Sequence, residues 1–80
     1  MQTYQPISCA FYDELELRAL RRQRCEIVYQ RPGQAAVTIT TVIRDFQTRD
    51  QAEYMIVANG PDIRLDWLVS IDGIAQSGYC

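Results

Sequence analysis

The sequence predicts a small α+β domain, mostly β, in which one N-terminal helix precedes a strongly bent antiparallel sheet of five short strands. Three observations predict it. Residues 9–22 follow a helix-capping signal and place apolar side chains at helical spacing. Several later segments are rich in β-branched and aromatic residues, and turn-forming residues separate them. A chain of 80 residues has room for one modest core, so we expect a single domain over residues 1–80.

The predicted helix runs from about Cys9 to Arg22. Residues 1–7 form an extended lead-in, because Pro6 disfavours helical backbone at the residue before it. Ser8 then stands in the position of an N-cap. Carboxylates in the first half of the helix and arginines in the last half agree with the helix dipole, and Glu14 and Arg18 are spaced for an i, i+4 ion pair.

One face of this helix is expected to pack against the sheet. At about 100° per residue, four apolar or aromatic side chains share one arc: Phe11, Tyr12, Leu15 and Ala19. Leu17 and Leu20 fall outside it. Asp13 and Glu16 are neighbours on the helix surface, whereas Glu14 points away from both.

Four later segments carry strand signals. The first two, 25–30 and 35–43, flank an Arg-Pro-Gly-Gln sequence that fits a type II turn, so they are predicted to form a hairpin. The polar stretch 44–51 is expected to break or bend the sheet. A third strand covers 53–60 and ends in a turn.

Residues 62–72 carry the clearest strand pattern, because apolar side chains alternate at Ile63, Leu65, Trp67, Val69 and Ile71. This predicts one half-buried strand, or two strands joined by a sharp bend, with Trp67 in the core. Residues 73–80 are expected to be a loose tail. A small, strongly bent sheet tends to close into a barrel. SH3-like, Sm-like and OB barrels all fit, and the N-terminal helix favours the Sm-like one.

Charge and cysteine content limit the functional classes. The net charge is −2, every positive charge is an arginine, and there is no histidine. A nucleic-acid-binding domain of this size usually has a positive excess, so the balance favours a basic protein partner over DNA or RNA. Three widely spaced cysteines without histidine predict neither a zinc site nor a disulfide framework. We interpret Cys9 and Cys25 as small buried residues and Cys80 as exposed.

The sequence predicts a cytosolic protein that is not an enzyme. It has no signal-peptide pattern and no apolar run long enough for a membrane span. It has no histidine for general-base catalysis, no nucleophile motif and no glycine-rich phosphate loop. Asp13 and Glu16 are placed on an exposed helix and not in a pocket that would separate their pKa values. We expect no cofactor and no metal.

The opening of the chain resembles a known family. Tyr4, Gln5, Pro6 and Cys9 are followed by Tyr12, Asp13, Leu15, Glu16 and Leu17, and this combination is similar to the start of the Rof (YaeO) family, bacterial inhibitors of the transcription terminator Rho. The segments "EYMIVA" and "DIRLDWLVSI" resemble later strands of that family, so the similarity covers roughly residues 3–72. Ala10 and Phe11 occupy positions where family members often have carboxylates.

The resemblance implies an Sm-like fold and an antitermination function. It implies that the protein binds the N-terminal RNA-binding domain of Rho as a monomer and keeps RNA out of the primary site. The same resemblance places the partner-binding role on Asp13 and Glu16. We add Glu14, Tyr4 and Gln5 as further candidates.

Each of these residues also has a purely structural interpretation. Asp13 and Glu16 could serve only the helix dipole, and Glu14 could pair with Arg18. Tyr4 and Gln5 could pack the helix onto the sheet. Asp62 and Asp66 are predicted to lie with Arg64 on the outer side of the last strand. Cross-strand pairing is their expected role, and a secondary acidic contact with the partner is the alternative.

The second functional hypothesis is an Sm-like RNA-binding module. Its support is the arginine-rich stretch from Arg18 to Arg24, which is more commonly a solvated face. The net acidity of the chain opposes this alternative.

Overall fold

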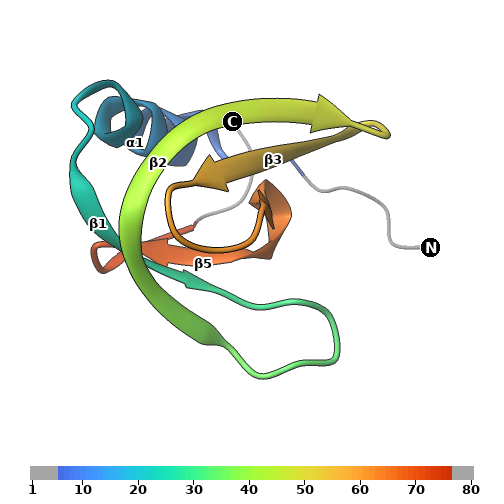
Figure 1. Ribbon diagram of the computed structural model, residues 1–80. Helices are drawn as coiled ribbons and strands as arrows, with labels where there is room; N and C mark the ends of the chain where they lie inside the picture. The colour runs from blue at the N-terminus through green and yellow to red at the C-terminus, as the bar shows by residue number, and fades with distance from the viewer. Residues whose placement is uncertain (1–5, 77–80) are drawn as a thin grey trace.

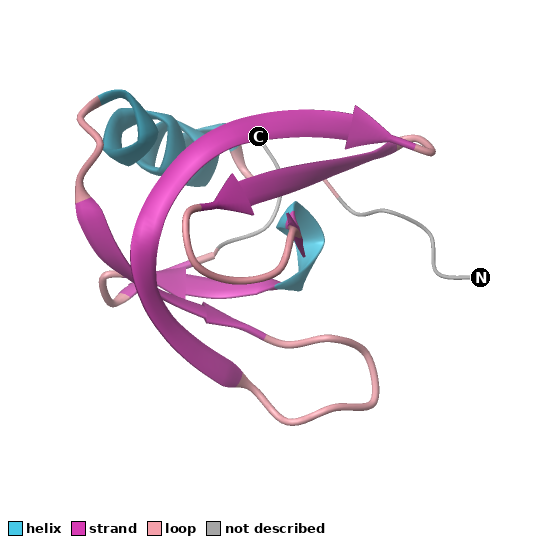
Figure 2. Cartoon of the chain, in the orientation of Figure 1, coloured by secondary structure: helices cyan, strands magenta, loops and turns pink. Residues whose placement is uncertain are grey.

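The computed structural model describes residues 6–76, and over this range an N-terminal helix is followed by a six-stranded antiparallel sheet (Figures 1 and 2). The elements are α1 (Cys9–Leu20), β1 (Arg24–Tyr29), β2 (Val37–Arg49), β3 (Ala52–Val57), β4 (Ile63–Arg64), the 3-10 turn η1 (Leu65–Trp67), β5 (Leu68–Ile71) and β6 (Ile74–Ala75). Along the sheet the strands follow the order β4-β3-β2-β1-β5-β6.

Both ends of α1 are capped. The Ser8 hydroxyl oxygen accepts the N–H of Phe11 at 3.1 Å, which confirms the predicted N-cap. At the other end, the N–H of Gln23 donates to the carbonyl of Arg18 at 3.0 Å. The N–H of Arg22 donates to the carbonyl of Ala19 at 3.1 Å, and Arg22 has a φ of 51°. This pair of bonds is a Schellman motif, and it ends the helix at Leu20, two residues before the predicted Arg22.

The hairpin of β1 and β2 is confirmed. Cys25 lies opposite Thr41 and Tyr29 opposite Val37 in an antiparallel register. In the connecting loop the N–H of Gln34 donates to the carbonyl of Arg31 at 3.1 Å. Gly33 between them has a φ of 74°, the left-handed value that the third position of a type II turn requires.

Strand β2 bends without breaking. The pairing register with β3 shifts between Ile43 and Asp45, so Arg44 is the extra residue of a β-bulge. The strand then continues to Arg49 through the polar stretch that could have ended it, and Figure 1 shows its long arc around the sheet. Asp50 and Gln51, with φ values of 49° and 65°, make the tight turn into β3.

Residues 62–72 form two strands joined by a bend, the second of the two predicted arrangements. The bend is η1, where each residue rotates about 120° instead of the 180° of a strand. This rotation shifts the alternating pattern, so Leu68 is buried and Val69 is 43% exposed. The prediction that Val69 faces the core was therefore wrong. Trp67, predicted to be core, is half-buried and packs against the core.

The sheet is open, whereas a closed five-stranded barrel was predicted. Strand β4 is only two residues long, and η1 leads the chain away before β4 can pair with β5. The sixth strand, β6, pairs with β5 through Ser70–Ala75 and Ile71–Ile74, so residues 74 and 75 belong to the sheet. Residues 77–80, the rest of the predicted tail, lie outside the described residues, as does most of the predicted lead-in.

The core lies between α1 and the concave side of the sheet. Helix side chains Phe11 and Leu15 are 2% and 0% exposed, as predicted from the helical spacing. They pack with residues of every long strand, among them Ile27, Ile43, Met55, Leu65 and Ile71. Leu17 and Leu20 are exposed on the other side of the helix.

The cysteines differ from each other. Cys25 is buried as predicted, its thiol donates to the carbonyl of Thr41 at 3.5 Å, and burial raises its pKa. Cys9 is exposed and disulfide-bonded, so the expectation of a buried thiol there was wrong. It is the first residue of α1, ahead of the buried stripe that begins at Phe11. Cys80 lies outside the described residues.

Candidate protein-binding surface

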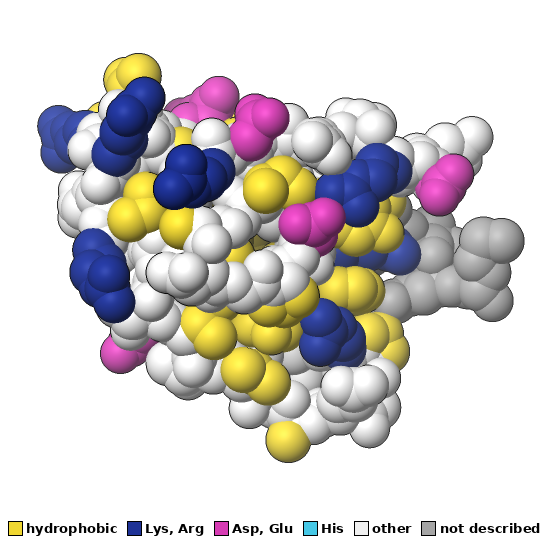
Figure 3. All heavy atoms as spheres, in the orientation of Figure 1, with side chains coloured by type: hydrophobic (Ala, Val, Ile, Leu, Met, Phe, Trp, Pro, Cys, Tyr) yellow, Lys and Arg dark blue, Asp and Glu magenta, His cyan; other side chains and the backbone are white. Residues whose placement is uncertain are grey.

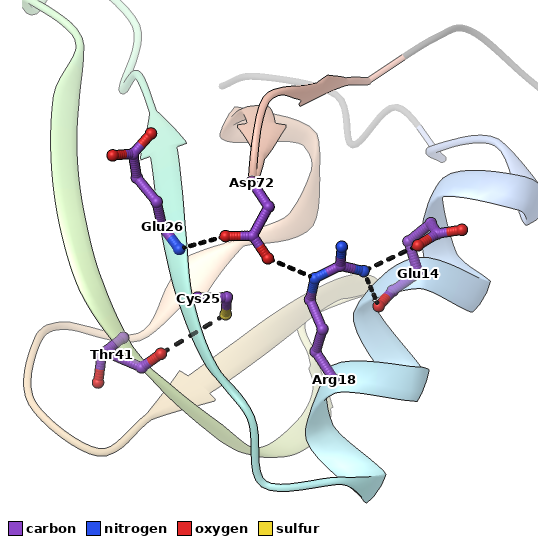
Figure 4. A network of polar contacts seen from close by, with 6 residues as sticks. All are labelled: Glu14, Arg18, Cys25, Glu26, Thr41 and Asp72. Atoms are coloured by element: carbon purple, nitrogen blue, oxygen red, sulfur yellow. Dashed lines mark hydrogen bonds and ion pairs between the residues drawn. The ribbon is translucent and has the colours of Figure 1, made fainter.

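Some of the charges stabilise the fold and are not available to a partner. Arg18 is 9% exposed, and its guanidinium donates to the carboxylates of Asp72 at 2.7 Å and Glu14 at 2.8 Å. Asp72 also accepts the N–H of Glu26 at 2.8 Å, as Figure 4 shows. These bonds hold the pKa of Asp72 below its usual value, first through Arg18 and then through the Glu26 N–H. The network joins α1, β1 and the turn after β5.

Two further ion pairs engage Arg49 with Asp62 and Arg64 with Asp66. The sequence predicted cross-strand pairing for both aspartates. For Asp66 this was wrong, because it lies in η1 and pairs with Arg64, two residues back along the chain. Asp62, just before β4, pairs with Arg49 at the end of β2. Arg31 lies over the rings of Tyr29 and Trp67, 5.5 Å and 5.4 Å from their centroids.

Four of the six remaining carboxylates lie where α1 meets β2 and β3. Asp13 and Glu16 are exposed on α1. Asp13 borders two hollows: one is also lined by Glu53 of β3, and the other by Glu16 and by Asp45 of β2. We call Asp13, Glu16, Asp45 and Glu53 the acidic face. No ion pair engages any of the four within residues 6–76.

An aromatic pair lies at the centre of the acidic face. The rings of Tyr12 and Phe46 are 5.3 Å apart, and both side chains are half-buried. Burial raises the pKa of the Tyr12 hydroxyl, and the nearby charges of Glu16 and Glu53 raise it further. The phenol is thus a neutral group surrounded by carboxylates. The second hollow adds the exposed Leu17 and Leu20, so the surface combines negative charge with apolar contact area.

The helix dipole does not account for Asp13 and Glu16. Neither lies in the first turn of α1, and favourable interaction with the dipole is confined to that turn. Among the described residues the side chain of neither forms a hydrogen bond or an ion pair. Exposed carboxylates with no local structural role are candidates for contact with a partner.

The other candidate residues are placed differently. Glu14 faces Arg18, away from the acidic face, and its carboxylate is engaged there. Tyr4 and Gln5 lie outside the described residues. Tyr12 contributes to the core, as predicted, and also lines the first hollow.

Sequence reasoning missed Asp45 and Glu53. Asp45 belongs to the polar stretch expected to interrupt the sheet, and only the bulge at Arg44 brings it beside α1. Glu53 had a detectable signal. It shares the inward-facing stripe of β3 with Met55 and Val57, and a carboxylate in such a stripe indicates that the strand end is open to solvent.

No family model matches this chain, and neither a curated protein nor a solved structure matches it significantly. Within residues 6–76, no helix has the length and apolar character needed to cross a membrane.

Proposed function

We propose that the protein inhibits Rho-dependent transcription termination by docking the acidic face on the RNA-binding N-terminal domain of Rho. The resemblance of residues 3–17 and of two later segments to the Rof (YaeO) family names this partner. Strong support within the molecule comes from one observation: the acidic face presents four carboxylates that form no ion pair among the described residues. A surface of this kind suits a basic partner.

The same proposal includes an Sm-like class for the fold. Its support is the N-terminal helix, the strongly bent β2 and the short 3-10 turn between β4 and β5. The described sheet is open and differs in this respect from a closed barrel of the Sm-like class.

In the proposed mechanism the acidic face occupies the site that RNA phosphates would otherwise fill. Carboxylates of Asp13 and Glu16 pair with basic side chains of Rho, while Tyr12, Leu17 and Leu20 supply apolar contact. Association between oppositely charged surfaces is accelerated by long-range attraction and weakened by salt. Bound RNA and the inhibitor therefore exclude each other on each Rho subunit.

Displacement of RNA tests the proposal. Rho hexamer is loaded with fluorescent poly-cytidine RNA, the protein is added, and anisotropy is followed at two salt concentrations. We expect a fall in anisotropy that is smaller at the higher salt concentration. Direct binding is measured in parallel by interferometry on immobilised Rho without RNA, so that any contact between this protein and RNA does not enter the result.

The matched variants are Asp13→Asn/Glu16→Gln and Glu26→Gln/Asp50→Asn. Each removes two negative charges from exposed side chains, and only the first changes the acidic face. We expect the first to weaken Rho binding by about tenfold or more and the second by less than twofold. Equal losses of Rho affinity in the two double variants would show that binding depends on the overall charge and not on the acidic face. Full binding by the first variant, with its fold intact by circular dichroism, would remove the acidic face from the interface.

A further inference from the structure

Within residues 6–76, half of the eight arginines have no carboxylate partner and no aromatic ring beneath them. Arg18, Arg49 and Arg64 form ion pairs, and Arg31 stacks on two rings. The other four are exposed and form no ion pair within residues 6–76: Arg21, Arg22, Arg24 and Arg44. Figure 3 shows arginine side chains gathered at the upper left of the molecule, over α1 and the start of β1.

Two of these arginines flank a hollow of about 370 Å³. Arg22, just after α1, and Arg44, at the bulge of β2, lie at its rim, and its remaining lining is Ala19, Val42, Ile43 and Ala58. The lining contains no carboxylate. The volume lies at the lower end of the range of about 300–1,000 Å³ for small-ligand pockets. Two guanidinium groups over an apolar floor suit an anion that carries an apolar or aromatic part.

The neighbouring residues extend the positive surface in one direction. Arg24 lies opposite Val42 in the β1–β2 register, and Arg21 precedes Arg22. Two carboxylates limit the surface in other directions. Glu26 lies two residues along β1 from Arg24, and Asp45 follows Arg44 toward the acidic face, whose second hollow Arg44 also borders. The hollow is therefore a positive region on a molecule whose net charge is −2.

The backbone of Arg22 gives independent support. This residue occupies the C′ position of the Schellman motif at a φ of 51°, where glycine is strongly preferred. A long cationic side chain at this position has a conformational cost and makes no ion pair among the described residues. Unfavourable backbone conformations of this kind are concentrated at functional sites.

We propose that the hollow between Arg22 and Arg44 binds one nucleotide unit of a single-stranded nucleic acid. The two guanidiniums contact a phosphate, the apolar floor accepts the base or sugar, and Arg21 and Arg24 contact adjacent phosphates. A free inorganic phosphate would use only two of the four arginines and would leave the floor empty. A duplex would keep its bases stacked and out of the hollow. The acidic net charge keeps the affinity modest.

The test is fluorescence anisotropy of a labelled 12-nucleotide oligouridine with the full-length protein, without Rho, from 50 to 200 mM NaCl. We expect binding in the range of about 10–100 µM at low salt. Arg22→Gly and Arg44→Gln are each expected to weaken it several-fold, and the double variant about tenfold. The double variant should also reduce the slope of log K against log salt by about 0.7, because the two guanidiniums contact a single phosphate.

Arg49→Gln is the matched control, because it removes the same charge from the same strand, five residues beyond Arg44. It should leave the affinity within twofold. If Arg49→Gln lost as much affinity as Arg44→Gln, the binding would come from non-specific charge attraction, and the proposed site would be wrong. Undetectable binding at 50 mM NaCl, or full binding by the folded double variant, would overturn it as well. If inorganic phosphate competed with the labelled oligouridine as effectively as unlabelled oligouridine does, the ligand of the hollow would be a free anion and not a nucleic acid. The proposed contact with Rho does not enter any of these measurements.

Discussion

The acidic face and the arginine-rich region around Arg22 and Arg44 are built differently. The acidic face collects single carboxylates from α1, β2 and β3, and the long bend of β2 brings them together. Four arginines have neither an ion pair nor a ring contact within residues 6–76, and three of them come instead from one short stretch at the end of α1 and the start of β1. Local sequence is thus enough to place most of the arginine-rich region, whereas the acidic face depends on the tertiary fold.

A third group of charges belongs to neither region. Three arginines and four carboxylates pair internally, and Arg18 alone takes two of those carboxylates. The pairing removes Arg18 from the positive region and Glu14 from the negative one. The two surfaces that are left for partners adjoin each other at Ala19 and Arg44, which line both hollows.

The largest predicted effect concerns this internal group. Arg18→Met keeps an apolar stem and removes the guanidinium, which leaves Glu14 and Asp72 without their shared partner. Loss of one member of a fully buried pair costs about 3–5 kcal/mol, and an exposed pair contributes about 1 kcal/mol or less. The two carboxylates are 40% and 31% exposed, so we expect the free energy of unfolding to fall by about 2–3 kcal/mol.

Urea denaturation measures this loss. Arg49→Met, which breaks the exposed pair with Asp62, is the comparison and should cost less than about 1 kcal/mol. Arg18→Lys should recover only part of the stability, because an ammonium cannot reproduce the fork of bonds to Glu14 and Asp72. Equal stability of Arg18→Met and the wild type would show that the network does not join α1 to the sheet.

The next prediction tests whether the two surfaces act independently. Asp13→Asn/Glu16→Gln should weaken Rho binding by about tenfold, or about 1.4 kcal/mol, and leave oligouridine binding unchanged or slightly tighter. Arg22→Gly should weaken oligouridine binding several-fold and leave Rho binding unchanged or slightly tighter. Arg44 is unsuitable here because it borders both hollows. If each variant reduced both activities to the same extent, the two regions would have to be treated as one surface.

Much of the fold could be predicted, because its signals are local. The Ser8 cap, the Phe11–Leu15 face and the Gly33 turn each depend on neighbouring residues, and all are present. The openness of the sheet was not predictable in this way. It depends on β4 stopping after two residues and on η1 changing the direction of the chain, which periodicity alone cannot show.

The candidate surface could be predicted only in part. Asp13 and Glu16 are exposed as the helical spacing required, whereas Asp45 joins them through a bulge that has no sequence signature. The arginine stretch was visible in the sequence, but its most buried member, Arg18, turns inward to Asp72, 54 residues away. A long-range partner of this kind cannot be deduced from local spacing.

Acid should weaken the internal network. Arg18 holds the pKa of Asp72 below its usual value, so in the range between the native and unfolded pKa the unfolded state binds more protons. The stabilisation is therefore complete above the usual aspartate pKa and is lost as the pH falls through the lower native value. Asp72→Asn should be less stable than the wild type by about 1 kcal/mol at pH 7.

Urea denaturation at a series of pH values from neutral to about 2.5 measures this difference between the wild type and Asp72→Asn. The gap in unfolding free energy should narrow below the usual aspartate pKa and close at the acidic end. A gap that stays constant over the whole range would mean that the ionised carboxylate is not what stabilises the turn.

The smallest predicted effect is a gain in stability from Arg22→Gly. Glycine adopts the left-handed C′ conformation without strain, but it also has more freedom in the unfolded chain, and the balance should favour the folded state by about 0.5 kcal/mol. For a domain of this size that raises the melting temperature by about 2–4 °C. Arg24→Gly, at the end of the same arginine stretch but within β1, should lower it instead. A less stable Arg22→Gly variant would show that the arginine side chain supports the helix end. A more stable variant that has lost oligouridine binding would show that Arg22 is retained for its charge, at the expense of the fold.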